Sequence, residues 1–99
     1  MLYILEGIDA PNAGARRAQA RPEHLKRIQT LVDQGRVVVG GPVLGLDSDD
    51  PAAGGVEGSL IIAEFEDLAS ARAWWEQDPY VLTQVFTKTT VRPFRQVVP

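Results

Sequence analysis

The feature that most constrains the fold is a pair of short segments, residues 37–39 and 60–62, that are apolar at successive positions. A strand with one face in water alternates apolar and polar side chains, whereas a strand covered on both faces is apolar throughout. The two segments therefore predict a sheet with both faces buried. A chain of 99 residues has room for one core, so we expect a single domain over residues 1–99. A second subunit would then cover the face that the chain's own helices leave bare, which predicts a homodimer.

The remaining patterns give the order strand, helix, strand, strand, helix, strand. Strands are expected at residues 2–8, 36–44, 59–66 and 85–98, with a loop at 45–58. Pro93 interrupts the last strand, so its second half is expected to be an edge strand or a bulged crossing. This order is that of the ferredoxin-like α+β fold, β-α-β-β-α-β, in which two helices cover one face of a four-stranded antiparallel sheet.

Two helices are expected between these strands. Residues 17–34 show helical periodicity, and Pro22 suits a first turn, so the regular helix is expected to begin near Arg21. Residues 68–77 predict the second helix, with Asp67 as its N-cap and Asp78 followed by Pro79 as its end.

The composition excludes several classes of site. The chain has no cysteine and one histidine, which excludes disulfide scaffolds, zinc ribbons, thiol nucleophiles and a two-histidine metal site within one chain. No residue pattern requires a metal or an organic cofactor. The formal charge of −3 and the scattering of basic residues around a helix indicate no nucleic-acid partner.

No segment approaches the roughly 20 apolar residues of a membrane-spanning helix, so no membrane contact is expected. Residues 1–6 lack the basic region and the cleavage site of a signal peptide. A cysteine-free chain suits a reducing compartment, and we expect a cytoplasmic protein.

His24 is the candidate for proton transfer near neutral pH. On a helical projection it lies about 40° from the centre of the apolar stripe, and Arg21 lies on the same side one turn earlier. Inward polar groups need polar partners or a polar cavity. A site and a structural histidine with both ring nitrogens bonded to protein are both consistent with this geometry.

The carboxylate partner of His24 can be argued from position. Asp33 lies about 180° around the helix and about 13 Å along it, so it cannot touch His24. Asp9 ends the first strand, close to the start of the following helix, and is the preferred catalytic partner, which would hold one tautomer of the ring. Asp78, on the inward flank of the second helix, is the alternative. Ser59, at the start of a strand, is a candidate for binding a ligand.

Short motifs run along nearly the whole chain, and their order and spacing are specific: Arg21-Pro22-x-His24-Leu25, Gly35-Arg36, Gly41-Pro42, the acidic segment 47–51, Gly58-Ser59, Ala63-Glu64-Phe65, Asp78-Pro79-Tyr80 and Pro93-Phe94. Together they resemble the YciI-like (YCII-related) family. The resemblance implies a dimeric α+β barrel of ferredoxin-like subunits and a small pocket with a histidine and an aspartate proposed as catalytic. Relatives include a dehydrochlorinase of chlorinated hydroxyquinols, although a fold does not determine a function.

Two functions follow as hypotheses. The first is an enzyme for a small oxygenated or cyclic molecule, with His24 and Asp9 as the acid–base pair and with Arg21, Ser59 and Asp78 as substrate-binding residues. The alternative is a small-ligand-binding or regulatory module that uses the same pocket without chemistry, or a partner-binding dimer whose histidine is structural. A histidine nitrogen open to a cleft, with a carboxylate on the other nitrogen, would distinguish a site capable of catalysis from a structural histidine, but would not distinguish catalysis from binding.

Overall fold

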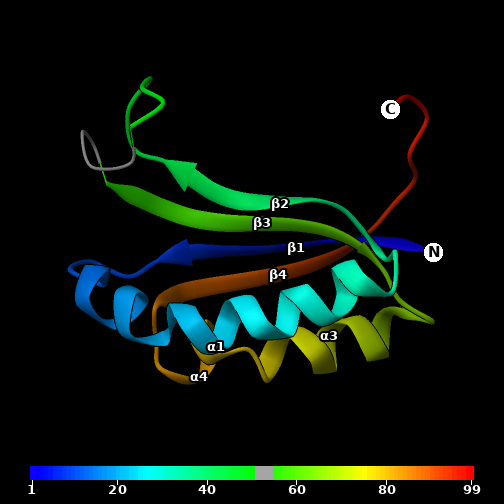
Figure 1. Cartoon of the computed structure of the whole chain (residues 1–99), viewed down its shortest axis with the longest axis horizontal. Coiled ribbons are helices and arrows are strands. Elements are labelled where there is room, and N and C mark those ends of the chain that lie inside the picture. The colour runs from blue at the N-terminus through cyan, green and yellow to red at the C-terminus, as the bar shows by residue number, and fades with distance from the viewer. Residues whose placement is uncertain (51–54) are drawn as a thin grey trace.

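The computed structural model describes residues 1–50 and 55–99, and its strands form one four-stranded antiparallel sheet in the order β2-β3-β1-β4. The elements follow along the chain as β1 (Leu2–Asp9), α1 (Gly14–Asp33), β2 (Val37–Leu44), β3 (Val56–Glu64), α3 (Leu68–Glu76), α4 (Pro79–Leu82) and β4 (Phe86–Phe94). The helices lie together on one side of the sheet (Figure 1). This confirms the predicted ferredoxin-like α+β fold.

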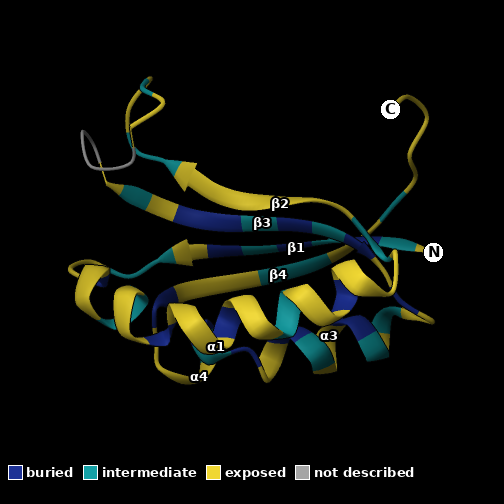
Figure 2. Cartoon of the chain, viewed as in Figure 1, coloured by how far each residue is buried: buried dark blue, intermediate teal, exposed yellow. Residues whose placement is uncertain are grey.

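The central strands β1 and β3 carry the core. Leu5 of β1 pairs with Ile61 of β3 on one side and with Val91 of β4 on the other. Leu5 and Ile61 point toward the helices and are almost completely buried. Figure 2 shows buried residues along β1, β3 and the inner sides of the helices, whereas β2 is largely exposed. The core therefore lies between the helices and the centre of the sheet.

The first helix is longer than the sequence predicts. It begins at Gly14 and contains Pro22 in its interior, where a first-turn position was expected. Pro22 lacks an amide hydrogen, and it lies on the exposed side of the helix, where water can bind the carbonyl left without a partner. The added turns are held by Arg16, which donates to the Gln84 carbonyl, and by Arg17, which donates to Asp9.

The ends of several other elements differ by a few residues from the prediction. The third strand begins at Val56, so the expected loop is shorter, and residues 51–54 of that loop lie outside the described residues. The last strand ends at Phe94 and runs through Pro93 at the edge of the sheet, where a missing amide hydrogen is tolerated. Asp67 caps α3 as expected, accepting from the amide of Ser70 at 2.7 Å.

The outer face of the sheet is left uncovered by residues 1–50 and 55–99. Ile8, Val39 and Val43 are 53%, 51% and 45% exposed. The successive apolar residues of 37–39 are thus only half covered here, because β2 is an edge strand and α1 does not pack tightly against it. Within the described residues, no helix is both long enough and apolar enough to cross a bilayer.

Candidate functional site

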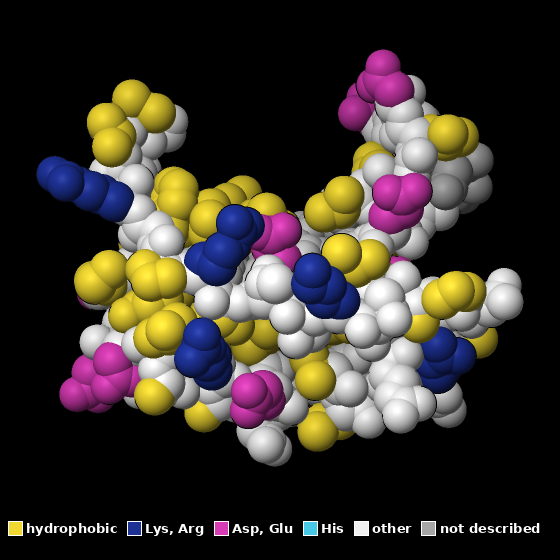
Figure 3. Space-filling model, turned by 180° about the vertical axis from the view of Figure 1, so that it is seen from behind, with side chains coloured by type: hydrophobic (Ala, Val, Ile, Leu, Met, Phe, Trp, Pro, Cys, Tyr) yellow, Lys and Arg dark blue, Asp and Glu magenta, His cyan; other side chains and the backbone are white. Residues whose placement is uncertain are grey.

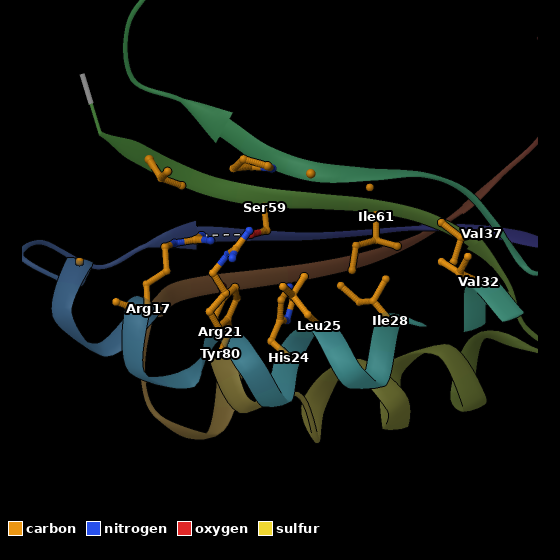
Figure 4. Close-up of a pocket in the computed structure, with 16 residues that line it drawn as sticks. Arg17, Arg21, His24, Leu25, Ile28, Val32, Val37, Ser59, Ile61 and Tyr80 are labelled. Atoms are coloured by element: carbon orange, nitrogen blue, oxygen red, sulfur yellow. Dashed lines mark hydrogen bonds between the residues drawn. The ribbon is translucent and has the colours of Figure 1, made fainter. Parts of the chain in front are cut away.

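A cavity of about 630 Å³ lies between α1 and the half of the sheet formed by β2 and β3. Its helical wall includes Arg17, Arg21 and His24, and its opposite wall includes Ser59 and Ile61. Figure 4 shows these side chains directed into the space between the helix and the sheet. Three of the residues expected at the site, Arg21, His24 and Ser59, therefore line one cavity.

His24 is buried, and its Nδ1 lies 2.7 Å from Oδ2 of Asp78. Its ring is stacked on Tyr80, with centroids 3.7 Å apart and planes inclined by 14°. Asp78 caps the one-turn helix α4, and Pro79 in the first position of that helix turns the chain so that Tyr80 follows directly beneath the imidazole. One short segment therefore supplies both the carboxylate and the ring that hold His24 in place.

Asp78 is completely buried and accepts three hydrogen bonds. Oδ2 accepts from the Tyr80 amide at 3.0 Å as well as contacting His24, and Oδ1 accepts from Nη1 of Arg27 at 3.1 Å. Arg27 also donates to the Trp74 carbonyl at 2.7 Å and lies over the Trp74 ring. A buried carboxylate with charged and hydrogen-bonding neighbours is stabilised in place. Asp78 therefore fixes the orientation of the imidazole.

The proposed pairing of His24 with Asp9 is wrong, because Asp9 binds a different side chain. Its two carboxylate oxygens accept from Nη2 and Nε of Arg17 at 2.7 and 2.9 Å. Arg17 also donates to Oγ of Ser59 at 3.0 Å, so these three residues form a second network beside the histidine. Asp9 does lie near the start of α1, as expected, but the early start of the helix brings Arg17 to it. His24 lies seven residues further on, about 10 Å along the axis.

The second ring nitrogen of His24 faces the cavity. Every fully buried side-chain nitrogen or oxygen in the described residues has a hydrogen-bond partner, yet none of the hydrogen bonds in residues 1–50 and 55–99 involves Nε2. Nε2 therefore reaches the cavity surface, which His24 lines. An imidazole held by a carboxylate at one ring nitrogen and open to a cavity at the other is the arrangement that proton transfer requires.

Arginine and tyrosine side chains set the charge at this end of the cavity. Burial would lower the pKa of Arg17, but the hydrogen bonds and the charge of Asp9 outweigh it, so the pKa is raised and the guanidinium stays charged. Burial raises the pKa of the Tyr80 hydroxyl, against the opposing effect of Arg17 and Arg21. The phenol is therefore neutral at physiological pH and can donate a hydrogen bond.

Three residues of this arrangement were not singled out from the sequence: Arg17, Arg27 and Tyr80. Arg17 could have been found, because it precedes Arg21 by four residues and so shares its helical face. Arg27 does not line the cavity and turns instead toward α3, where it donates to the Trp74 carbonyl. Its contact with Asp78 depends on how the helices pack, which no local pattern reports. No cluster of three or more potential metal ligands occurs in the described residues.

Comparison with known proteins gives a consistent assignment. The model of the YCII-related domain family matches residues 1–95. Protein YciI of Escherichia coli O6:H1 is 44% identical over 97 residues, covering 98% of this chain and 99% of that protein. A Haemophilus influenzae relative is 37% identical over 97 residues with the same coverage.

A solved structure is also similar over nearly the whole chain. It is that of 5-chloro-2-hydroxyhydroquinone dehydrochlorinase (TftG) from Burkholderia phenoliruptrix, in complex with 2,5-dihydroxybenzoquinone. The TM-score is 0.85 at 26% identity, and the match covers 96% of this chain and 94% of that chain. The same α+β fold therefore occurs in an enzyme with a small cyclic ligand.

Proposed function

Because the chain belongs to the YCII-related domain family, and because its cavity holds an oriented imidazole, we propose that it is a small-molecule enzyme in which His24 and Asp78 form an acid–base pair. The observation that carries the proposal is the hydrogen bond of 2.7 Å between Nδ1 of His24 and Asp78, together with the opening of Nε2 to the cavity. A structural histidine would have both nitrogens bonded to protein, and this one does not within the described residues.

The chemistry begins at Nε2. With the proton held on Nδ1 by Asp78, Nε2 carries a lone pair and accepts a proton from an O–H or an acidic C–H of the substrate. In an elimination, the released electron pair forms a new double bond, and the leaving group departs as an anion with the pair of its broken bond. The imidazolium then returns its proton to water or to the product. Asp78 stabilises the transient positive charge, and no cofactor takes part in this sequence.

The dehydrochlorinase supports an elimination of this kind, since it has the same fold at 26% identity and was solved with an oxygenated ring, 2,5-dihydroxybenzoquinone. In this chain, Arg21 would bind an anionic or phenolate oxygen, because it lines the cavity one turn before His24. Ser59 would donate to a second oxygen. The substrate class proposed is therefore a cyclic or phenolic compound that carries a leaving group or a movable proton.

We also propose a homodimer in which two sheets face each other. Support comes from the outer face of the sheet, where Ile8, Val39 and Val43 are about half exposed although the helices cover the opposite face. Seen from behind, hydrophobic side chains follow the upper edge of the molecule between the C-terminal segment and the β2–β3 connection (Figure 3). An apolar patch of this kind is typical of an interface. The cysteine-free chain suits the cytoplasm, where the dimer would work. Sedimentation should give twice the chain mass of 10.8 kDa at low micromolar concentration, and a single species of 10.8 kDa would exclude the dimer.

An unbiased metabolite screen tests the catalytic proposal. Wild-type protein and His24→Ala are each incubated with a metabolite mixture, depletion is read by mass spectrometry, and binding is read by thermal shift. We expect a depleted compound whose turnover falls by about 10²- to 10⁴-fold in His24→Ala, the usual loss of a general acid or base. Glu23→Ala, the neighbouring residue on the exposed side of the helix, is the matched control and should leave turnover unchanged. Compounds that bind the wild type but are never consumed would instead support the binding or regulatory alternative.

A further inference from the structure

The helical wall of the cavity changes character at His24. Two cationic side chains, Arg17 and Arg21, line the cavity on the N-terminal side of His24, with the small Ala18 between them in the sequence. On its C-terminal side the lining is aliphatic, with Leu25, Ile28 and Val32. Figure 4 shows the same division, with the arginines near Ser59 and the aliphatic side chains extending toward Val37 and Ile61. The residues from Leu25 to Val32 that line the cavity, with Val37 and Ile61 opposite them, are called the apolar trough below. The cavity thus has a charged end and an apolar end, and the open nitrogen of His24 lies between them.

The charged end has one cation without a carboxylate partner. Arg17 is neutralised by Asp9, whereas Arg21 has no ion pair and no hydrogen bond in the described part of the chain. The described lining contains no aspartate and no glutamate. Ser59 accepts a hydrogen bond from Arg17, so its own hydroxyl hydrogen is free to be donated to a ligand. Arg21 and Ser59 therefore offer a charge and a donor to a single anionic group.

The apolar end has surface that none of the described residues covers. Leu25 and Val32 are 43% and 46% exposed although both line the cavity. The whole cavity, about 630 Å³, lies within the range of about 300–1,000 Å³ found for sites that hold ligands of drug size. A compact ring held between Arg21 and His24 would leave the apolar trough empty. Covering the trough requires a ligand with an apolar extension.

We propose that the substrate of this site is an amphiphilic acid, with its anionic group on Arg21 and Ser59 and an extended hydrocarbon chain or second ring in the apolar trough. The inference rests on the proposed function in taking this cavity as the substrate site, and it adds the shape and charge of the substrate. His24 then acts on an atom between the anionic group and the apolar body. An anion at one end and an apolar extension at the other fix the direction in which the molecule enters.

Three simple probes separate charge from length: octanoate, butanoate and octanamide. Affinities are measured by isothermal titration calorimetry, and the place of binding is read from amide chemical shifts in ¹⁵N-labelled protein. Each fully buried methylene contributes about fourfold in affinity, so four half-covered methylenes should make octanoate bind at least about tenfold more tightly than butanoate. We expect octanoate to bind at least about tenfold more tightly than octanamide, because the amide lacks the charge that Arg21 pairs with.

Matched variants assign the two preferences to the two ends of the cavity. Arg21→Gln should abolish the preference for octanoate over octanamide while keeping the preference for octanoate over butanoate. Arg21→Lys should restore part of the preference for octanoate over octanamide. Arg72→Gln, an exposed arginine of α3, is the control. Leu25→Ser should weaken octanoate severalfold and leave butanoate unchanged, whereas Leu82→Ser, at a residue of α4 that is 62% exposed and outside the cavity lining, should change neither affinity.

The inference is overturned by equal affinities for octanoate and butanoate, by equal affinities for octanoate and octanamide, or by shifts on the outer face of the sheet at Ile8 and Val39 instead of along α1. These measurements involve no turnover. If the acid–base function fails, the affinities stay as expected. If the present inference fails, turnover of a compact ring that depends on His24 is unaffected, so the two failures are distinguishable.

Discussion

Replacing Asp78 by asparagine changes one fully buried carboxylate into an amide of the same shape. In the wild type, Oδ2 of Asp78 contacts Nδ1 of His24 and accepts from the Tyr80 amide, and Oδ1 accepts from Arg27. An amide has a single acceptor oxygen, so it cannot serve both ends. If the oxygen stays toward His24, the NH₂ group faces the donor of Arg27. If the amide is turned, its oxygen keeps Arg27, and its NH₂ group faces Nδ1 and the Tyr80 amide.

The second orientation keeps the charge-assisted bond and is expected to prevail. The structure then loses one bond to a backbone amide and the ionised partner of the histidine. Hydrogen bonds to charged groups contribute about 1.5–3 kcal/mol and neutral ones about 1 kcal/mol, and Arg27 is partly exposed, which reduces its share. We expect Asp78→Asn to lower the free energy of unfolding by about 1–3 kcal/mol, measured by urea denaturation. Asp33→Asn, the same change on the exposed side of α1, should stay within about 0.5 kcal/mol of the wild type.

The turned amide also changes the tautomer of the ring. In the wild type, Nδ1 carries the proton and donates it in a hydrogen bond to Asp78. In Asp78→Asn, the NH₂ group is a donor, so Nδ1 must be unprotonated and the ring proton moves to Nε2. His24 is the single histidine of the chain, so ¹⁵N-histidine labelling gives the spectrum of one imidazole. Two-bond ¹H–¹⁵N correlations, recorded at a pH where the ring is neutral, identify the protonated nitrogen. A proton on Nε2 in the wild type, or the same tautomer in both proteins, would refute the assigned role of Asp78.

Two further predictions concern the scaffold that holds the site. A methyl group added at Gly7 would lie 2.5 Å from the Phe86 ring, so Gly7→Ala should cost about 1–3 kcal/mol of overpacking and lower the melting temperature. Gly14→Ala, where nothing lies within 4 Å, should leave the melting temperature unchanged or raise it. The Ser70 amide lowers the pKa of Asp67 below its ordinary value of 3.8, so the stabilisation is complete above pH 3.8 and is lost as the pH falls through the lower folded value. The difference in unfolding free energy between wild type and Asp67→Asn should therefore shrink in acid, and a pH-independent difference would contradict the capping role.

Local patterns in the sequence determined the four strands, the two longer helices and which way His24 faces, whereas the one-turn helix α4 was not expected. Periodicity within one helix or strand depends on neighbours three, four or two positions away, and the order of elements followed from it. The same reasoning limited Pro93 to an edge or a bulge, because a missing amide hydrogen is a property of the residue itself, and the structure places it on the edge strand β4. It failed at Pro22, where anchoring contacts of Arg16 and Arg17 outweigh the local penalty and extend α1 past the proline.

The tertiary structure alone decided which carboxylate holds the histidine. Asp9 and Asp78 are 15 and 54 residues from His24 in the sequence, and this topology brings both to α1, Asp9 near its start and Asp78 near its middle. The choice of carboxylate depended on a competing partner, because both carboxylate oxygens of Asp9 accept from Arg17. It also depended on the single turn of α4, which directs Asp78 and Tyr80 inward. Distances across a fold and competition between partners are set by how elements pack. Such contacts leave no periodic signal in the chain, whereas the face of a helix does.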